Sequence, residues 1–207
     1  MLQRCRNIPV CAFYQELKKT MHIYLPDAVL KFQSRKKPEI VKKGSDLPLT
    51  DVTLSDDSSA YPPKLFCSYN QNKLMIVFNI EQYYTQEDLE LIKQAGKADD
   101  IAVLGINIEN ILVTQEEIRE YLTEPYSKTW IYNRLVEDFD KKYRHAATEP
   151  ARFHDRYICF AQKDPLENVY SAGWEDCNRC AYCYKYGFCL AKSYINHAED
   201  FEKPFGI

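Results

Sequence analysis

The sequence predicts an α/β domain, with a mixed sheet flanked by helices, followed by a small cysteine-rich metal knuckle. Three observations support this prediction. Strand-like and helix-like segments alternate in the middle of the chain, residues 151–207 lose that aliphatic periodicity, and four cysteines fall between positions 177 and 189. We therefore expect an α/β domain over residues 1–150 and a metal-binding region over residues 151–207.

Length and composition set the class of protein. A chain of 207 residues with 45% hydrophobic content is long enough to bury a core. No apolar run reaches the length of a membrane span or a signal peptide, so we expect a cytoplasmic protein with no membrane partner. The net charge of -3 gives no general attraction for phosphate backbones, so contact with nucleic acid requires a local basic patch.

The first elements follow from proline positions and apolar spacing. Pro9 suits the first turn of a helix that runs to about Met21. Residues 23–32 favour an extended conformation, because Pro26 disfavours helix. Residues 33–63 are polar and rich in serine, aspartate and lysine, and we interpret them as an insertion or hairpin excursion.

The middle of the chain then alternates strand and helix. Residues 74–80 form a short apolar run typical of a buried central strand, and residues 101–108 form a second strand. Thr85 with Asp88 predicts a capped helix that Gly96 closes, and Thr114 with Glu117 predicts a short helix through Leu122. A longer helix is expected over residues 127–144, with an inward face made of Ile131, Leu135 and Phe139.

The cysteine cluster is the strongest functional signal. Cys177, Cys180, Cys183 and Cys189 place four soft donors close together, and the two-residue gaps let backbone turns aim neighbouring sulfurs at one point. Structural zinc sites use four thiolates in a tetrahedron and supply folding energy to segments that lack a core of their own. We therefore expect these four cysteines to bind zinc.

Other interpretations of the cluster stay open. Cys177, Cys180 and Cys183 also have a C-x2-C-x2-C spacing found in ferredoxins, so a 4Fe-4S cluster is the alternative cofactor. His197 is a candidate replacement for one thiolate, and a thiol redox protein that uses Cys180 and Cys183 is a third class. We expect the other four cysteines to be small buried apolar residues: Cys5, Cys11, Cys67 and Cys159.

Carboxylates form a second candidate site. Asp27 follows a proline in an extended segment, Glu81 follows the apolar strand, and Glu16 projects from the first helix. Hard oxygen ligands at strand ends are what a magnesium-dependent phosphodiesterase needs. The residues Pro26-Asp27, Ile80-Glu81 through Thr85, and 103–108 resemble the PD-(D/E)xK nuclease core, with the closest likeness to the competence-protein CoiA group.

This resemblance implies a restriction-endonuclease-like core, a magnesium site and a flanking cysteine cluster. Residue by residue, it makes Glu16 the helix carboxylate, Asp27 the central metal ligand and Glu81 the second ligand. Tyr83 occupies the position where the pattern has a lysine, and Lys93 on the following helix is the candidate ammonium.

Two functions follow from these features. The first is a metal-dependent nuclease or nuclease-like protein that acts on DNA or RNA and carries a structural zinc site. The second is a non-enzymatic zinc-stabilised module with a degenerate nuclease fold, which binds nucleic acid or a protein partner. The missing lysine and the acidic balance favour the module, whereas the three retained carboxylates favour the enzyme.

Overall fold

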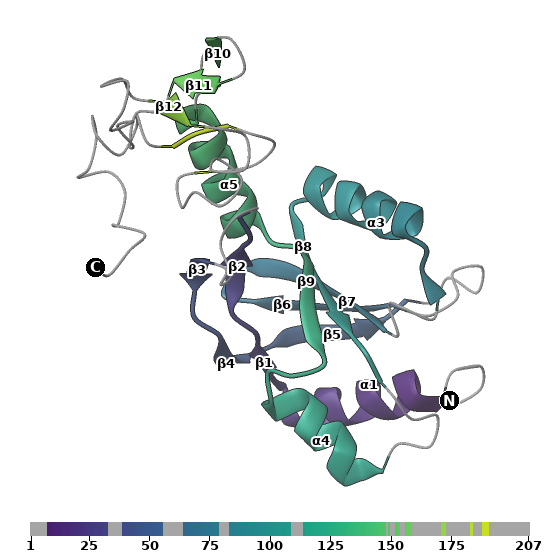
Figure 1. Cartoon of the computed structure of the whole chain (residues 1–207). Coiled ribbons are helices and arrows are strands. Elements are labelled where there is room, and N and C mark those ends of the chain that lie inside the picture. The colour runs from purple at the N-terminus through teal and green to yellow at the C-terminus, as the bar shows by residue number, and fades with distance from the viewer. Residues whose placement is uncertain are drawn as a thin grey trace. The chain divides into compact units, whose positions relative to one another are not determined.

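A computed structural model describes residues 8–32, 39–55, 64–78, 83–108, 114–147, 149, 152–153, 156–158, 171–172, 183 and 188–190. These residues form an α/β protein with a mixed sheet flanked by helices, as predicted (Figure 1). The chain groups into two compact units. The first contains Met1–Ala28 and Lys42–Leu135, and the second contains Val29–Val41 and Val136–Ile207. This grouping differs from the boundary expected at residue 150.

The first unit begins with α1 (Ile8–Thr20), which confirms the predicted helix. Its inner face is apolar, with Val10, Phe13 and Leu17 each fully buried. The helix ends where Met21 adopts a φ of 53°, a left-handed conformation that leaves the helical path. The chain then enters β1 (His22–Leu25).

The polar stretch after residue 33 contains strands. In the described residues, β1 pairs antiparallel with β4 (Ser45–Pro48). The strands β2 (Ala28–Leu30) and β3 (Glu39–Lys42) pair in a second two-stranded sheet. The strands β3 and β4 therefore lie within the stretch that was expected to be an insertion or hairpin excursion. The next strand, β5 (Thr50–Leu54), belongs to the main sheet, so the predicted insertion at about 33–63 is too long at its C-terminal end.

The main sheet has the order β5-β6-β7-β8-β9. Its other strands are β6 (Leu65–Tyr69), β7 (Asn72–Phe78), β8 (Ile101–Ile106) and β9 (Lys128–Tyr132). The neighbours β7 and β8 run parallel, and the remaining pairs are antiparallel. The apolar run that begins at Leu74 therefore forms the central strand, as its composition predicted.

Two helices begin at the predicted caps. In α3 (Gln86–Ala98) and α4 (Gln115–Thr123), the N-cap threonine accepts a hydrogen bond from the backbone three residues later, and an acidic side chain at that position accepts one in return. The capping pairs are Thr85 with Asp88, and Thr114 with Glu117. These capping boxes satisfy backbone donors that the first turn of a helix leaves unpaired.

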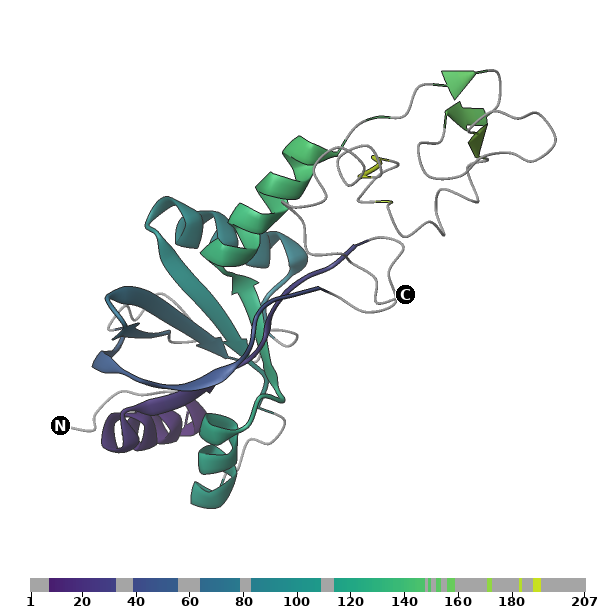
Figure 2. The same cartoon turned by 90° about the vertical axis from the view of Figure 1, so that its left-hand side faces the viewer.

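Helices cover both faces of the sheet (Figure 2). Along β7, alternate side chains point to opposite faces. Leu74, Ile76 and Phe78 join α1 and α4 in one core, whereas Met75 and Val77 join Ile92 of α3 in another. The first helix and α4 therefore lie on one face of the sheet, and α3 lies on the other.

The prediction of one helix over residues 127–144 is wrong in its first third. Residues 128–132 form β9, and the helix α5 (Arg134–Ala146) begins only after Asn133, whose side chain accepts a hydrogen bond from the Leu135 amide at 3.0 Å. The sequence Thr-Trp-Ile-Tyr at 129–132 is rich in strand-forming residues, and pairing with β8 decides the matter.

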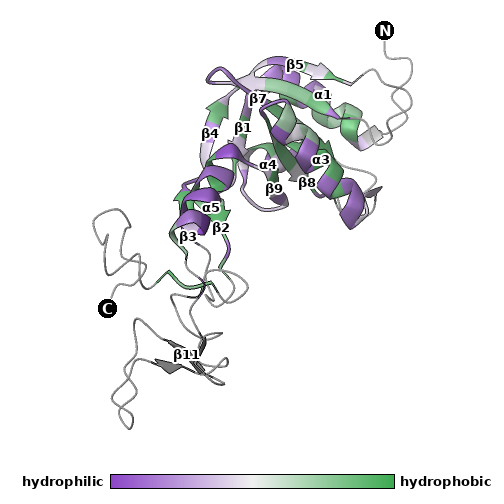
Figure 3. Ribbon diagram, turned by 90° about the horizontal axis from the view of Figure 1, so that it is seen from above, coloured by the Kyte–Doolittle hydropathy of each residue, from purple (hydrophilic) through white to green (hydrophobic). Residues whose placement is uncertain are grey.

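The inward face expected on that helix is also wrong. Leu135 and Phe139 of α5 are 44% and 38% exposed, and Ile131 lies on β9. Hydrophobic and hydrophilic residues both occur along α3 and α5 (Figure 3). The buried side of α5 is instead centred on Tyr143.

Gly96 does not close α3, because the helix continues to Ala98 and Asp99 provides its C-cap. The glycine is buried where α3 crosses β8. A Cβ added at Gly96 would lie 2.6 Å from Cγ2 of Val103 and 2.8 Å from the backbone oxygen of Ile101. The absence of a side chain is therefore what allows α3 to approach the sheet.

We expect Gly96→Ala to lower the free energy of unfolding by about 1–3 kcal/mol, the usual cost of overpacking a core. The helix propensity of alanine opposes this loss by about 1 kcal/mol at most. Urea unfolding followed by circular dichroism measures the change. A gain in stability, the normal result for an unhindered helical glycine, would contradict the close packing of α3 on β8.

The second unit contains α5 from Val136 onward, β3 up to Val41, and three short strands. These are β10 (Arg152–Phe153), β11 (Arg156–Ile158) and β12 (Ser171–Ala172), which form an antiparallel sheet. Most of the region expected as a knuckle lies outside the described residues. Among the helices of the described ranges, none combines the length and apolarity that crossing a bilayer requires.

Candidate functional site

Glu16 is a buried carboxylate on α1 whose partners come mainly from α4. Its side chain is 6% exposed. Nε of Arg119 donates to Oε1 at 2.9 Å, and Nε2 of Gln115 donates to Oε2 at 3.1 Å. Nζ of Lys19 approaches Oε2 at 3.3 Å. Both carboxylate oxygens are therefore used in joining α1 to α4.

These contacts keep Glu16 ionised. The hydrogen bond from Arg119 is the largest influence, and it holds the pKa of Glu16 below its usual range, against the opposing effect of burial. Two cations already neutralise the carboxylate. A metal ion would have to displace one of them, so the arrangement fits a structural ion pair better than a metal ligand.

Asp27 lies between β1 and β2, and its two oxygens have different surroundings. Oδ1 accepts a hydrogen bond from the Gly44 amide at 2.6 Å. Oδ2 lies 3.6 Å from Nζ of Lys43, a side chain that is 77% exposed. Such an exposed pair contributes little stability. Oδ1 of Asp27 is thus held by a short hydrogen bond, whereas Oδ2 can exchange the Lys43 ammonium for another partner.

Two contacts hold the segment that carries Asp27. The indole Nε1 of Trp130, on β9, donates to the backbone oxygen of Pro26 at 3.1 Å. Gly44 packs so closely that an added Cβ would lie 2.6 Å from the backbone oxygen of Leu25. The hydrogen bond and the close packing together fix the backbone around Asp27, which orients the carboxylate in advance of any ligand.

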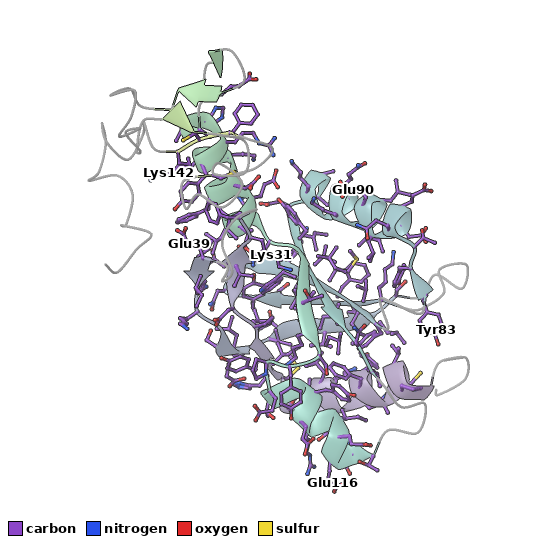
Figure 4. The ribbon with its side chains drawn as sticks, in the orientation of Figure 1. Lys31, Glu39, Tyr83, Glu90, Glu116 and Lys142 are labelled. Atoms are coloured by element: carbon purple, nitrogen blue, oxygen red, sulfur yellow. The ribbon has the colours of Figure 1, made fainter. Side chains whose placement is uncertain are left out.

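The sequence candidates do not form one cluster in the described residues. Lys93 lies on α3 and pairs with Glu90 at 3.5 Å. Glu90 is labelled on α3 in Figure 4, on the opposite side of the sheet from Glu116 of α4. Glu16 and Lys93 therefore belong to helices on opposite faces. Glu81 lies outside the described residues.

No group of three or more histidine, cysteine or acidic side chains suited to a metal ion occurs among the residues that the structure describes. Cys177 and Cys180 lie outside that part of the chain. The magnesium assignment of Asp27 and Glu81 likewise stays a prediction.

Two of the clustered cysteines are described, and they face each other. Cys183 and Cys189 form an isolated antiparallel β-bridge. Side chains of directly opposed residues in such a pair lie on the same face, with Cβ atoms about 4.5–5.5 Å apart. Cys183 is 4% exposed, and neither residue is in a disulfide. The backbone therefore brings together two thiols that are separated by five residues.

The remaining cysteines were predicted to be small buried apolar residues, which is confirmed for one and wrong for another. Cys67 on β6 is buried, as predicted, and burial raises its pKa to about 12, which makes it unreactive. Cys11 on α1 is only half-buried and is disulfide-bonded, so the prediction of a buried apolar thiol is wrong there. Cys5 and Cys159 lie outside the described residues.

Lys128 is a buried lysine that sequence reasoning missed. It is 9% exposed, and its Nζ donates to the backbone oxygens of Leu122 and Glu124 at 3.2 and 2.6 Å. It therefore caps the C-terminal end of α4. Burial lowers its pKa to about 7, although nearby Glu124 and Asp46 oppose the shift. A lysine just past the end of a helix indicates such a cap. Because residues 127–144 were predicted to be a helix, Lys128 was not recognised as one.

Comparisons with protein-family models, with curated proteins and with solved structures found no match to this chain.

Proposed function

We propose that this chain is a nuclease-like protein that acts on nucleic acid and whose C-terminal cysteines hold a structural zinc ion. The observation that carries the proposal is the pairing of Cys183 with Cys189 across a β-bridge. Two sulfurs bound to one tetrahedral zinc, each at about 2.3 Å, lie a little under 4 Å apart. Directly opposed residues on one face suit that separation.

Sequence spacing supplies the other two donors. Cys177 and Cys180 precede Cys183 at two-residue gaps, which is a spacing common in zinc sites. A 4Fe-4S cluster uses the same thiolates and is the competing cofactor. Zinc is the preferred assignment because the segment has few aliphatic residues with which to build a core of its own, and structural zinc supplies folding energy in such cases.

Nucleic acid is the proposed substrate because of the resemblance to PD-(D/E)xK nucleases. The mixed sheet with helices on both faces agrees with that resemblance at the level of architecture. Asp27 fits a metal ligand, since one oxygen is anchored by an amide and the other lies beside an exposed ammonium.

We assign the magnesium site to Asp27 and Glu81, and we leave Glu16 out of it. Glu81 follows the last described residue of β7 by three positions. Glu16 does not fit, because α4 and Lys19 already occupy both of its oxygens. A bound magnesium ion would supply Lewis-acid polarisation of a phosphate oxygen. Asp27 would hold its ligand oxygen in place through the Gly44 amide.

A non-enzymatic module is the second candidate function, and one observation favours it. Lys93, the candidate ammonium, pairs with Glu90 on the helix that covers the other face of the sheet from Glu16. In this alternative the fold binds nucleic acid or a protein without cutting, and the zinc site is unchanged.

The zinc site is tested by calorimetric titration of the reduced, metal-free protein with zinc. We expect one binding event per chain with proton release, because thiols must lose protons to bind. Cys189→Ser should weaken binding at least tenfold. The matched control is Phe188→Ser, which changes an exposed neighbour and should leave affinity unchanged. Equal affinity in the two variants would overturn the assignment of Cys189.

The nuclease activity is tested by plasmid cleavage with magnesium or manganese. Asp27→Asn keeps an acceptor for the Gly44 amide but removes the charge, so we expect intact folding and a loss of cutting of at least about tenfold. Asp51→Asn, at an exposed position on β5, is the control. Wild-type protein that cuts nothing, or cutting that Asp27→Asn leaves unchanged, would favour the module.

A further inference from the structure

The second unit has a hydrophobic core of its own, which we call the α5 core. Its buried members are Leu30, Phe32, Tyr143 and Leu190. The rings of Phe32 and Tyr143 meet edge to face, with centroids 5.3 Å apart. The Tyr143 hydroxyl donates to Oε1 of Glu39 at 2.6 Å, which ties α5 to β3. Figure 4 labels Glu39 on β3.

Leu190 connects this core to the cysteine cluster. It directly follows Cys189, and it is fully buried among residues that lie more than forty positions earlier in the chain. Exposure falls along the three residues, because Phe188 is 41% exposed, Cys189 is half-buried and Leu190 is 0% exposed. The segment therefore inserts its last side chain into the core and holds the cysteine at the core's edge.

The bridge partner of Cys189 is also buried. Cys183 is 4% exposed and lies opposite Cys189. Cys189 is thus next to a residue of the packed apolar cluster, and its bridge partner Cys183 is shielded from water. A structural metal site in this position shares its backbone with the α5 core.

We infer that Leu190 is a positioning residue for the metal site, and that metal binding and packing of the α5 core stabilise each other through it. The inference rests on the proposed zinc site and deepens it. An ion that draws Cys189 toward Cys183 restricts the chain at position 189, which lowers the entropy that Leu190 loses on docking. Docked Leu190 in turn presents Cys189 to the ion.

Coupling of this kind is reciprocal. If zinc strengthens the docking of Leu190, then docking must strengthen zinc binding by the same factor. Couplings between two sites commonly amount to about 5- to 150-fold in affinity. The consequence is regulatory, because removal of the metal loosens the packing of Tyr143 on α5 as well as the cysteine segment.

The first test compares zinc affinity in two variants of the full chain, measured by competition with a chelator. Leu190→Ala removes the docked side chain and no ligand, so we expect affinity to fall about 5- to 150-fold. Phe188→Ala removes an exposed side chain from the same segment, and we expect less than about a twofold change. Leu190→Met conserves volume and should restore most of the affinity.

The second test is hydrogen exchange of the α5 amides with and without zinc. In the wild type, we expect zinc to slow exchange around Tyr143. In Leu190→Ala, zinc should give much less protection, a difference that a purely structural role for Leu190 would not produce. Amides of α3 in the first unit serve as an internal control and should exchange at the same rate in all samples.

The outcomes separate the inference from the proposal beneath it. Wild-type protein that binds no zinc defeats both. Zinc binding with equal affinity in the wild type and Leu190→Ala defeats the coupling alone and leaves the zinc site standing. If zinc slows the exchange of the α5 amides equally in both proteins, the coupling alone is likewise defeated.

Discussion

Phe13→Ala should lower the free energy of unfolding by about 3–5 kcal/mol, the range observed when a buried phenylalanine is truncated. Phe13 is fully buried on α1, and its ring meets that of Phe78 edge to face with centroids 5.1 Å apart. The substitution removes the contact between α1 and the central strand and leaves a cavity between them. Urea unfolding monitored by circular dichroism gives the difference.

A control on the other face of the sheet isolates the effect of burial. Leu91 of α3 is 64% exposed, so Leu91→Ala removes a large apolar side chain that packs little. We expect its free energy of unfolding to change by less than about 0.5 kcal/mol. A loss of similar size in the two variants would contradict the packing of α1 on the sheet.

Lys128→Met should change how stability depends on pH. Burial holds the pKa of Lys128 at about 7 in the folded protein, from an ordinary value of 10.5. Between these values the unfolded chain carries a proton that the folded protein lacks, so wild-type stability rises with pH across that window. The methionine variant has no such group and lacks this contribution.

The difference between the two proteins is the quantity to measure. The free energy of unfolding of the wild type minus that of Lys128→Met should increase from pH 7 to pH 10 by up to about 1.4 kcal/mol for each pH unit. Thermal or urea unfolding at four pH values is sufficient. A difference that stays constant over this range would show that Lys128 is not buried as a neutral amine.

Local signals predicted the parts of the fold that depend on neighbours in sequence. The capping pairs Thr85–Asp88 and Thr114–Glu117 determine where α3 and α4 begin, because the contact closes within three residues. The apolar run at Leu74 predicted the central strand for a similar reason, since a strand buried on both faces needs apolar side chains at every position.

Features decided by distant contacts were missed. Residues 128–132 have the spacing of a helix, yet pairing with β8 makes them a strand. Gly96 resembled a helix end, but its real constraint is the backbone of Ile101 across the crossing of α3 and β8. Tertiary packing overrides local preference in both places.

In the candidate site, too, local features were predicted from the sequence and distant contacts were not. Glu16 and Asp27 were identified from sequence, but their partners were not. Arg119 lies 103 residues from Glu16, and Gly44 lies within the polar stretch that sequence analysis treated as an excursion. The cysteine spacing predicted that thiols would gather, but it contained nothing to indicate that Leu190 enters the α5 core.

The proposed function depends on the C-terminal thiols closing around one zinc ion. Elemental analysis of the freshly purified full chain, combined with a count of reactive thiols, tests it most directly. We predict about one zinc per chain, with protein that is colourless. Stoichiometric iron would identify an iron–sulfur cluster in place of zinc. The absence of both metals, with the clustered thiols oxidised in pairs, would contradict a metal site at these cysteines.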